Sequence, residues 1–124
     1  LELGRGFSFI GNQYRLVYNN KEYFVDMLYF HRGLRCLVAI ELKIGNFKAE
    51  YVGKMNLYLS LLDKLEKKQD ENHAIGIILC ADTDHLDVEI ALQDINKPIG
   101  VAEYQLLPKD KLEKLLINEL KNKQ

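Results

Sequence analysis

The first half of the chain alternates apolar, aromatic-rich runs with short polar turns. Residues 7–18 and 21–31 are rich in Tyr, Phe, Val and Ile, and between them stands Asn19-Asn20, a dipeptide suited to the positive φ angles of a type I′ hairpin turn. A further apolar run covers 34–43, and Gly33-Leu34 fits a type II′ turn, which takes glycine at its first central position. The pattern therefore predicts three consecutive antiparallel strands.

From residue 48 onward the hydrophobic period becomes that of a helix. Over 48–68 the apolar positions recur at helical spacing and charged residues fall between them. These apolar positions are Tyr51, Met55, Tyr58, Leu62 and Leu65. The stretch AIGIILCA (74–81) then predicts a short strand buried on both faces, parallel to a neighbour because a helix leads into it.

The last third of the chain repeats this succession of helix and strand. Asp84 can cap a helix over 85–95, and IGVAEYQL (99–106) predicts the final strand. A closing amphipathic helix carries Leu112, Leu115, Leu116 and Leu120. The predicted order is βββαβαβα, preceded by the end of a helix near Gly4, which makes the fold a mixed α/β sheet with flanking helices.

The composition constrains the number of domains and the cellular compartment more than it constrains the function. The 124 residues contain no linker, so we expect one domain over 1–124, and leucine at position 1 indicates a segment cut from a longer chain. The net charge of −1 weighs against a nucleic-acid coat protein, since a polyanion would have to meet a local patch. Cys36 and Cys80 lie in apolar runs without metal-ligand spacing, which fits a reducing cytoplasm. No run approaches the roughly 20 apolar residues that span a membrane.

Three charged residues, Asp26, Glu41 and Lys43, interrupt the apolar runs. The second turn, at 32–35, places Asp26 directly opposite Glu41, and the first turn places Gln13 opposite Asp26. Lys43, two residues beyond Glu41, points to the same face of the sheet. The sequence thus predicts one patch of four polar side chains drawn from three strands.

Two carboxylates opposed in this way repel each other, because their Cβ atoms lie roughly 4.5–5.5 Å apart. A raised pKa would neutralise one acid, whereas a divalent cation such as Mg²⁺ would use both, since it takes one or two protein carboxylates and keeps several waters. Lys43 beside such an ion could orient or deprotonate a water molecule. The alternative is a buried ion cluster without chemistry, or charges on a solvent-facing sheet face.

An aspartate that ends one apolar strand, followed by E-L-K inside the next, resembles the PD-(D/E)XK nuclease superfamily. More narrowly, LELGRGFSFIGNQYRL, FVDMLYFHRGLRCLVAIELKIGNFKAEYVGKMNLYLSLLD and KPIGVAEYQL resemble the YhcG C-terminal nuclease domain family over nearly the whole chain. The usual proline before the aspartate is absent, since Val25 stands there. The resemblance implies a restriction-endonuclease-like mixed sheet and a metal-dependent endonuclease that hydrolyses phosphodiester bonds, with DNA as the expected substrate.

The resemblance also implies roles for single residues. Mg²⁺ would be bound by Asp26, Glu41 and the backbone carbonyl of Leu42, and Mn²⁺ could replace Mg²⁺ at the same ligands. Gln13 would position the attacking water, and Glu2, on a helix before the first strand, would serve a second ion. The catalytic residues implied are Asp26, Glu41, Lys43, Gln13 and Glu2.

The expected partners are nucleic acid, an N-terminal domain of the same full-length chain and, where both strands are cut, a second copy in a homodimer. The competing hypothesis is a non-catalytic module on the same fold that binds DNA or docks a protein. Four side chains could contact a nucleic-acid backbone, although a solvated or surface role explains three of them at least as well and a structural role is favoured for His31. They are His31, Lys48, Lys54 and Arg32.

Overall fold

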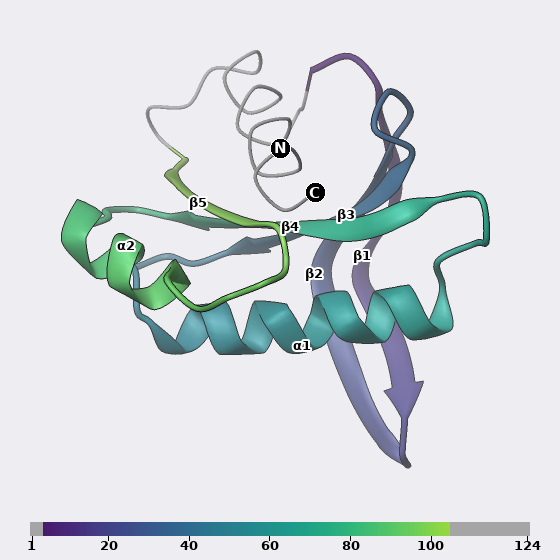
Figure 1. Ribbon diagram of the computed structural model, residues 1–124, viewed down its shortest axis with the longest axis horizontal. Helices are drawn as coiled ribbons and strands as arrows, with labels where there is room; N and C mark the ends of the chain where they lie inside the picture. The colour runs from purple at the N-terminus through teal and green to yellow at the C-terminus, as the bar shows by residue number, and fades with distance from the viewer. Residues whose placement is uncertain (1–3, 105–124) are drawn as a thin grey trace.

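The computed structural model describes residues 4–104, which form a five-stranded sheet and two helices (Figure 1). The strands lie across the sheet in chain order, with the first three antiparallel and the last three parallel. The elements are β1 (Phe7–Tyr18), β2 (Lys21–His31), β3 (Cys36–Leu42), α1 (Glu50–Leu65), β4 (Asn72–Cys80), α2 (His85–Leu92) and β5 (Ile99–Glu103). The order βββαβαβ is confirmed, while the closing helix and the helix expected before Gly4 lie outside the described residues.

The ends of several elements differ from the prediction by a few residues. The helix predicted over 48–68 is shorter at both ends, and the last strand stops at Glu103 instead of continuing to residue 106. The fourth strand begins earlier than predicted, because the Asn72 amide donates to the Arg35 carbonyl at 2.8 Å. The predicted cap of the second helix is confirmed, since the Asp84 carboxylate accepts from the Leu86 amide at 2.9 Å.

One of the two predicted hairpin turns is confirmed and the other is wrong in type. Asn19 and Asn20 have φ angles of 53° and 60°, as a type I′ turn requires. In the second turn the left-handed residue is Arg35, with φ of 51°, and not Gly33. The turn is a four-residue loop over 32–35 that His31 closes by accepting the Leu34 amide on Nδ1 at 3.0 Å. The register between β2 and β3 is still the predicted one. A two-residue loop would pair Arg32 with Arg35 and therefore His31 with Cys36, and His31 and Cys36 are also paired across the observed four-residue loop.

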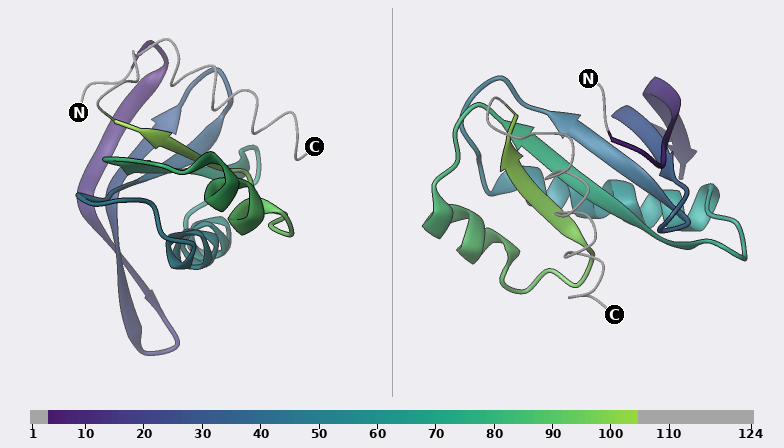
Figure 2. Two further views of the ribbon diagram at one scale, coloured as in Figure 1. Left: turned by 90° about the vertical axis from the view of Figure 1, so that its left-hand side faces the viewer. Right: turned by 90° about the horizontal axis from the view of Figure 1, so that it is seen from above.

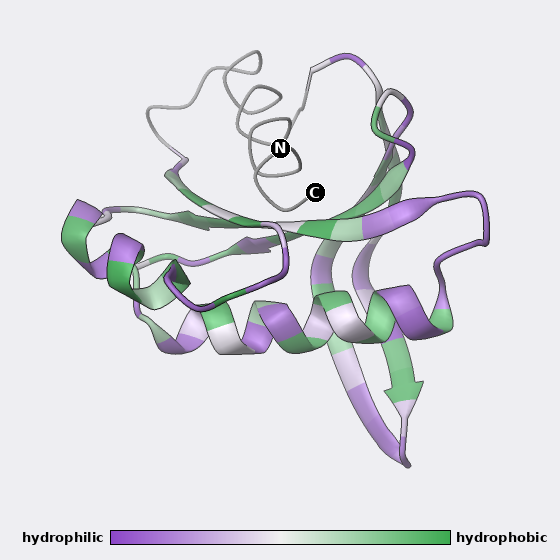
Figure 3. Cartoon of the chain, in the orientation of Figure 1, coloured by the Kyte–Doolittle hydropathy of each residue, from purple (hydrophilic) through white to green (hydrophobic). Residues whose placement is uncertain are grey.

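Helix α1 packs on one face of the sheet (Figure 2). Met55, Leu59 and Leu62 are fully buried there, and the apolar and polar bands that alternate along α1 in Figure 3 follow from this one-sided packing. Gly76 on β4 permits the close approach, since a Cβ atom at that position would lie 2.6 Å from the sulfur of Met55. Helix α1 is thereby packed closely against β4.

The opposite face of the sheet carries a second buried cluster, which includes Val38 and Ile40 of β3 and Ile77 of β4. Side chains of β3 therefore alternate strictly between two apolar layers up to Ile40. Neither helix in the described part of the chain is long and apolar enough to cross a membrane.

Candidate active site

Asp26 and Glu41 meet where the pairing of β2 with β3 ends. The last pair of the ladder is Met27 with Ile40, so the next position in this register places Asp26 opposite Glu41, as the sequence predicted. The two carboxyl groups share a side-chain hydrogen bond. Both lie on the face of the sheet that α1 covers, because Leu28 and Ala39, two residues away in each strand, belong to the α1-facing core.

Three further donors and charges surround Asp26. Gln13 Nε2 donates to Asp26 Oδ1 at 3.2 Å, and the Leu42 amide donates to Asp26 Oδ2 at 3.1 Å. Burial alone would raise the pKa of Asp26, but its hydrogen bonds with Glu41, Leu42 and Gln13 and the charge of Lys43 outweigh burial and lower it. Asp26 is therefore the member of the pair that carries the negative charge at neutral pH.

The pKa of Glu41 is shifted in the opposite direction from that of Asp26. Its side chain is only 3% exposed, and Oε1 has no hydrogen-bond partner within the described residues. Burial, the hydrogen bond with Asp26 and the charge of Asp26 raise the pKa of Glu41 to about 8, against the charges of Lys43 and Lys54. Without a cation, Glu41 is mostly neutral at pH 7, and one of its oxygens is buried unsatisfied.

Lys43 follows directly after β3 and is half-buried. Its amide donates to the Leu79 carbonyl at 2.8 Å, which extends the parallel pairing with β4 and holds the backbone in place. Its Nζ lies 4.8 Å from the centroid of the Tyr51 ring on α1, within the range of a cation–π contact. The sequence predicted the position of Lys43 but not its aromatic partner.

Gln13 reaches Asp26 through an unusual backbone conformation. Its φ is 45°, in the left-handed region that a residue with a side chain seldom adopts. Val25 and Leu28 both belong to the α1-facing core, although residues three apart in a regular strand point to opposite faces. The hairpin of β1 and β2 therefore changes face at the level of Gln13 and Asp26, and this irregularity lies at the candidate site, as backbone strain often does.

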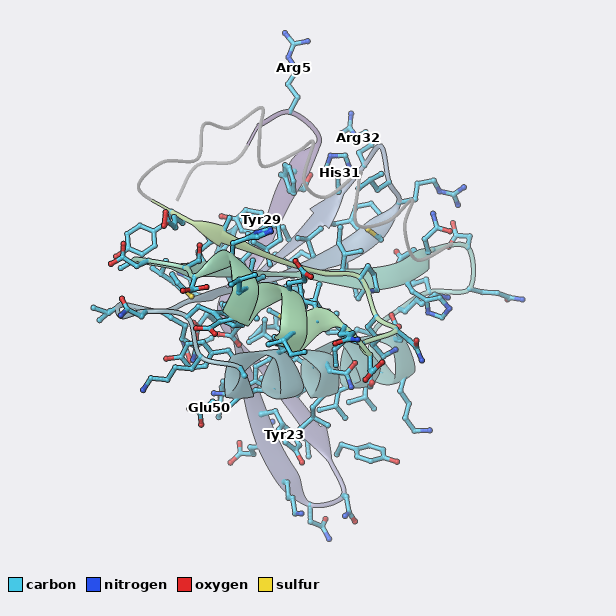
Figure 4. All side chains as sticks on the ribbon, turned by 60° about the vertical axis from the view of Figure 1, so that its left-hand side comes forward. Arg5, Tyr23, Tyr29, His31, Arg32 and Glu50 are labelled. Carbon is cyan, nitrogen blue, oxygen red and sulfur yellow. The ribbon has the colours of Figure 1, made fainter. Side chains whose placement is uncertain are left out.

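The remaining predicted residues lie in different places. His31 is 3% exposed and packs edge-on against Phe7 at the turn after β2, so its geometry fits the structural role and not a contact with nucleic acid. Figure 4 shows His31 and Arg32 together at this turn. Glu41 lies five residues beyond Cys36, the partner of His31, which corresponds to about 17 Å along β3 at the usual rise per residue. Lys48 is exposed just before α1. Glu2 lies outside the described residues.

Two residues of α1 interact electrostatically with the acid pair, and one of them, Tyr58, was not among the predicted site residues. Tyr58, predicted only as a core residue, is buried, and burial together with the charges of Glu41 and Asp26 raises its pKa to about 12. Lys54, predicted only as a backbone contact, has its Nζ 5.6 Å from the centroid of the Tyr58 ring. Helical spacing alone cannot show this, because it does not state which part of a strand a helix covers.

A divalent metal ion fits this arrangement. The unsatisfied Oε1 of Glu41 and the carboxylate of Asp26 are hard oxygen ligands, the type that Mg²⁺ and Mn²⁺ prefer. Within residues 4–104 no group of three or more His, Cys, Asp or Glu side chains is arranged so that it could hold a metal ion. Such a pair suits an ion that keeps several waters and does not suit a closed structural site.

The comparisons with known proteins agree with this geometry. Residues 1–121 match the family described as "YhcG PDDEXK nuclease domain". The chain is 39% identical over 120 residues to the protein named "Putative nuclease YhcG" of Escherichia coli (strain K12), a match that covers 97% of this chain and 32% of that protein. The chain thus spans about a third of the length of this relative.

Among solved structures, the fold is similar to that of a repair endonuclease from Pyrococcus abyssi, with a TM-score of 0.56 at 15% identity. That similarity covers 80% of this chain and 38% of the other, and it establishes the fold, a restriction-endonuclease-like mixed sheet. The predicted fold class and family are both confirmed. The chain belongs to the family of YhcG PDDEXK nuclease domains.

Proposed function

We propose that this nuclease domain cuts DNA and depends on Mg²⁺ bound between Asp26 and Glu41. The observation that carries the proposal is the buried, unsatisfied oxygen of Glu41 beside a second carboxylate. A buried acid in this state destabilises the fold, and a bound cation would remove that cost. The carbonyl oxygen of Leu42, between Glu41 and Lys43 in sequence, is the third proposed ligand.

When bound, Mg²⁺ would supply a water of lowered pKa and offset negative charge on the phosphate. Asp26 stays ionised through the donors around it, and Gln13 fixes the orientation of its carboxylate. Lys43, held over the Tyr51 ring, orients the attacking water. Hydrolysis forms a bond from the water oxygen to phosphorus and breaks the bond from phosphorus to one ester oxygen, which leaves with a proton.

DNA is the proposed substrate because the domain is a nuclease and its structural neighbour is named as a repair endonuclease. We further propose that a second domain of the full-length protein selects the target, since the matched relative is about three times as long as this chain. A homodimer in which each copy cuts one strand remains the proposal for double-strand cleavage.

The proposal is tested by incubating purified protein with supercoiled plasmid. We expect nicking with Mg²⁺ or Mn²⁺, none with a chelator, and none for Asp26→Asn. The matched control is Asp87→Asn, which removes an exposed carboxylate from α2. Equal cutting by Asp26→Asn and Asp87→Asn would exclude Asp26 as a ligand, and plasmid left intact by the wild type would refute nuclease action on DNA.

A further inference from the structure

The N-terminal half of α1 brings a second lysine to the carboxylate pair. Tyr51, Lys54 and Tyr58 are three and four residues apart, so they lie along one side of the helix. The charges of Asp26 and Glu41 act on Tyr58, and the charge of Lys54 acts on Glu41. This side of α1 therefore lies within the electrostatic field of the site.

Each of the two lysines at the site lies over an aromatic ring of α1. Lys43 Nζ is 4.8 Å from the Tyr51 centroid, and Lys54 Nζ is 5.6 Å from the Tyr58 centroid. Tyr58 is buried and its position is therefore fixed by packing, whereas Lys54 is exposed. The ammonium group of Lys54 thus lies beside a buried ring and open to solvent, close enough to Glu41 for its charge to act on that carboxyl group.

The charges at the proposed site leave a role for the ammonium group of Lys54. In the proposed mechanism, Asp26 and Glu41 would together offset the two positive charges of a bound Mg²⁺, and Lys43 would interact with the attacking water. The phosphate that is cut gains negative charge on its non-bridging oxygens in the transition state, and a positioned cation stabilises that charge.

We propose that Lys54 binds a non-bridging oxygen of the phosphate being cut and stabilises the charge that develops there. The inference rests on the proposed nuclease activity and adds a residue of stated role to it. Lys54 then acts in the chemical step, unlike a lysine that only attracts the DNA backbone.

The same helix offers a matched control. Lys64 lies in the last turn of α1, and its Nζ is 5.8 Å from the centroid of Tyr18, near the tip of the β1–β2 hairpin. Lys64→Met and Lys54→Met each remove one charge and one lysine–tyrosine contact from α1. Only Lys54→Met removes a charge that acts on Glu41.

The experiment measures cleavage of a short fluorescent duplex over a range of DNA concentrations for the wild type, Lys54→Met, Lys54→Arg and Lys64→Met. Affinity for the same duplex is measured by anisotropy with Ca²⁺ in place of Mg²⁺, and thermal melting checks the fold. We expect Lys54→Met to lower kcat about 100-fold and to change the Kd less than about three-fold. Lys54→Arg should recover part of kcat, and Lys64→Met should stay within about two-fold of the wild type.

Three outcomes would overturn the inference. If Lys54→Met cuts as fast as Lys64→Met, Lys54 has no part in the reaction. If Lys54→Met binds the duplex more weakly and with a smaller dependence on salt, but keeps the kcat of the wild type, Lys54 only contacts the DNA backbone. If the wild type itself cuts no DNA, the nuclease proposal fails and this inference fails with it, whereas the first two outcomes leave the nuclease proposal intact.

Discussion

Two buried polar side chains stand at opposite ends of the hairpin formed by β2 and β3. His31, before the turn, and Glu41, at the open end, are each 3% exposed. His31 accepts the Leu34 amide at 3.0 Å and packs against Phe7 with ring centroids 4.6 Å apart. Glu41 shares a hydrogen bond with another acid, and its Oε1 finds no partner within the described residues.

The difference distinguishes a polar group with a structural role from one that we propose to be functional. Folded proteins satisfy nearly all their buried polar atoms, and His31 follows that rule by closing a turn. Glu41 breaks the rule in a strand whose preceding residues are all buried and apolar. The cation that we propose between Asp26 and Glu41 would account for both its unsatisfied oxygen and its raised pKa.

The largest effect should come from Glu41→Gln. The substitution keeps the shape of the side chain but removes the carboxylate that we assign to the metal, so plasmid nicking with Mg²⁺ should fall by at least about 100-fold. Circular dichroism should show an unchanged fold. Nicking within a few-fold of the wild type would mean that the buried acid is structural, as His31 is.

The next effect should come from His31→Ala, which tests the other end of the hairpin. It removes the acceptor of the Leu34 amide and leaves a cavity beside Gly6 and Gly33, whose positions lie against the imidazole. We expect the free energy of unfolding in urea to fall by about 2 kcal/mol. The nicking rate of the folded fraction should stay within about two-fold, and a much larger loss would place His31 in the reaction.

The pH dependence of stability should distinguish the two ends further. The pKa of Glu41 is raised to about 8 in the folded, metal-free protein, so between its unfolded value near 4.5 and pH 8 the folded state holds a proton that the unfolded state has released. The free energy of unfolding should therefore fall as the pH rises through this window, by on the order of 1–2 kcal/mol after relaxation is allowed for. Urea titrations with chelator at pH 5 and pH 8 measure the change, and Glu41→Gln should remove most of it. A wild-type protein that gains stability over the same window would contradict the assignment.

The smallest effect should come from Gln13→Gly. Glycine adopts the φ of 45° without strain, so the free energy of unfolding should rise by up to about 1 kcal/mol. The loss of the hydrogen bond to Asp26 should lower nicking about ten-fold. Stability and activity falling together would show that Gln13 supports the fold and does not serve the site.

Much of the hairpin could be predicted because turns and registers are local. The Asn19-Asn20 turn and the spacing of the second turn fixed which residues oppose one another, even though Gly33 is not the left-handed residue of its turn. The hydrophobic period of α1 likewise predicted Met55 and Tyr58 as buried residues.

The positions of Tyr51 and Tyr58 of α1 beside the acid pair could not be predicted in this way, although Lys54 was named as a possible phosphate contact. These positions depend on how closely the helix approaches the sheet, which follows from packing between distant residues such as Met55 and Gly76. The left-handed conformation of Gln13 also carries no sequence signal, since glutamine is not a residue that favours it. The catalytic and metal-binding roles assigned to Asp26, Glu41, Lys43, Gln13, Leu42 and Glu2 all stay predictions.

The most direct test of the account is isothermal titration of Mn²⁺ into the wild type, Glu41→Gln and His31→Ala. If the open end of the hairpin is a metal site, the wild type and His31→Ala should bind with similar affinity, and Glu41→Gln should show no comparable heat. Equal binding by Glu41→Gln, or no binding by the wild type, would contradict the claim that this acid pair holds a cation.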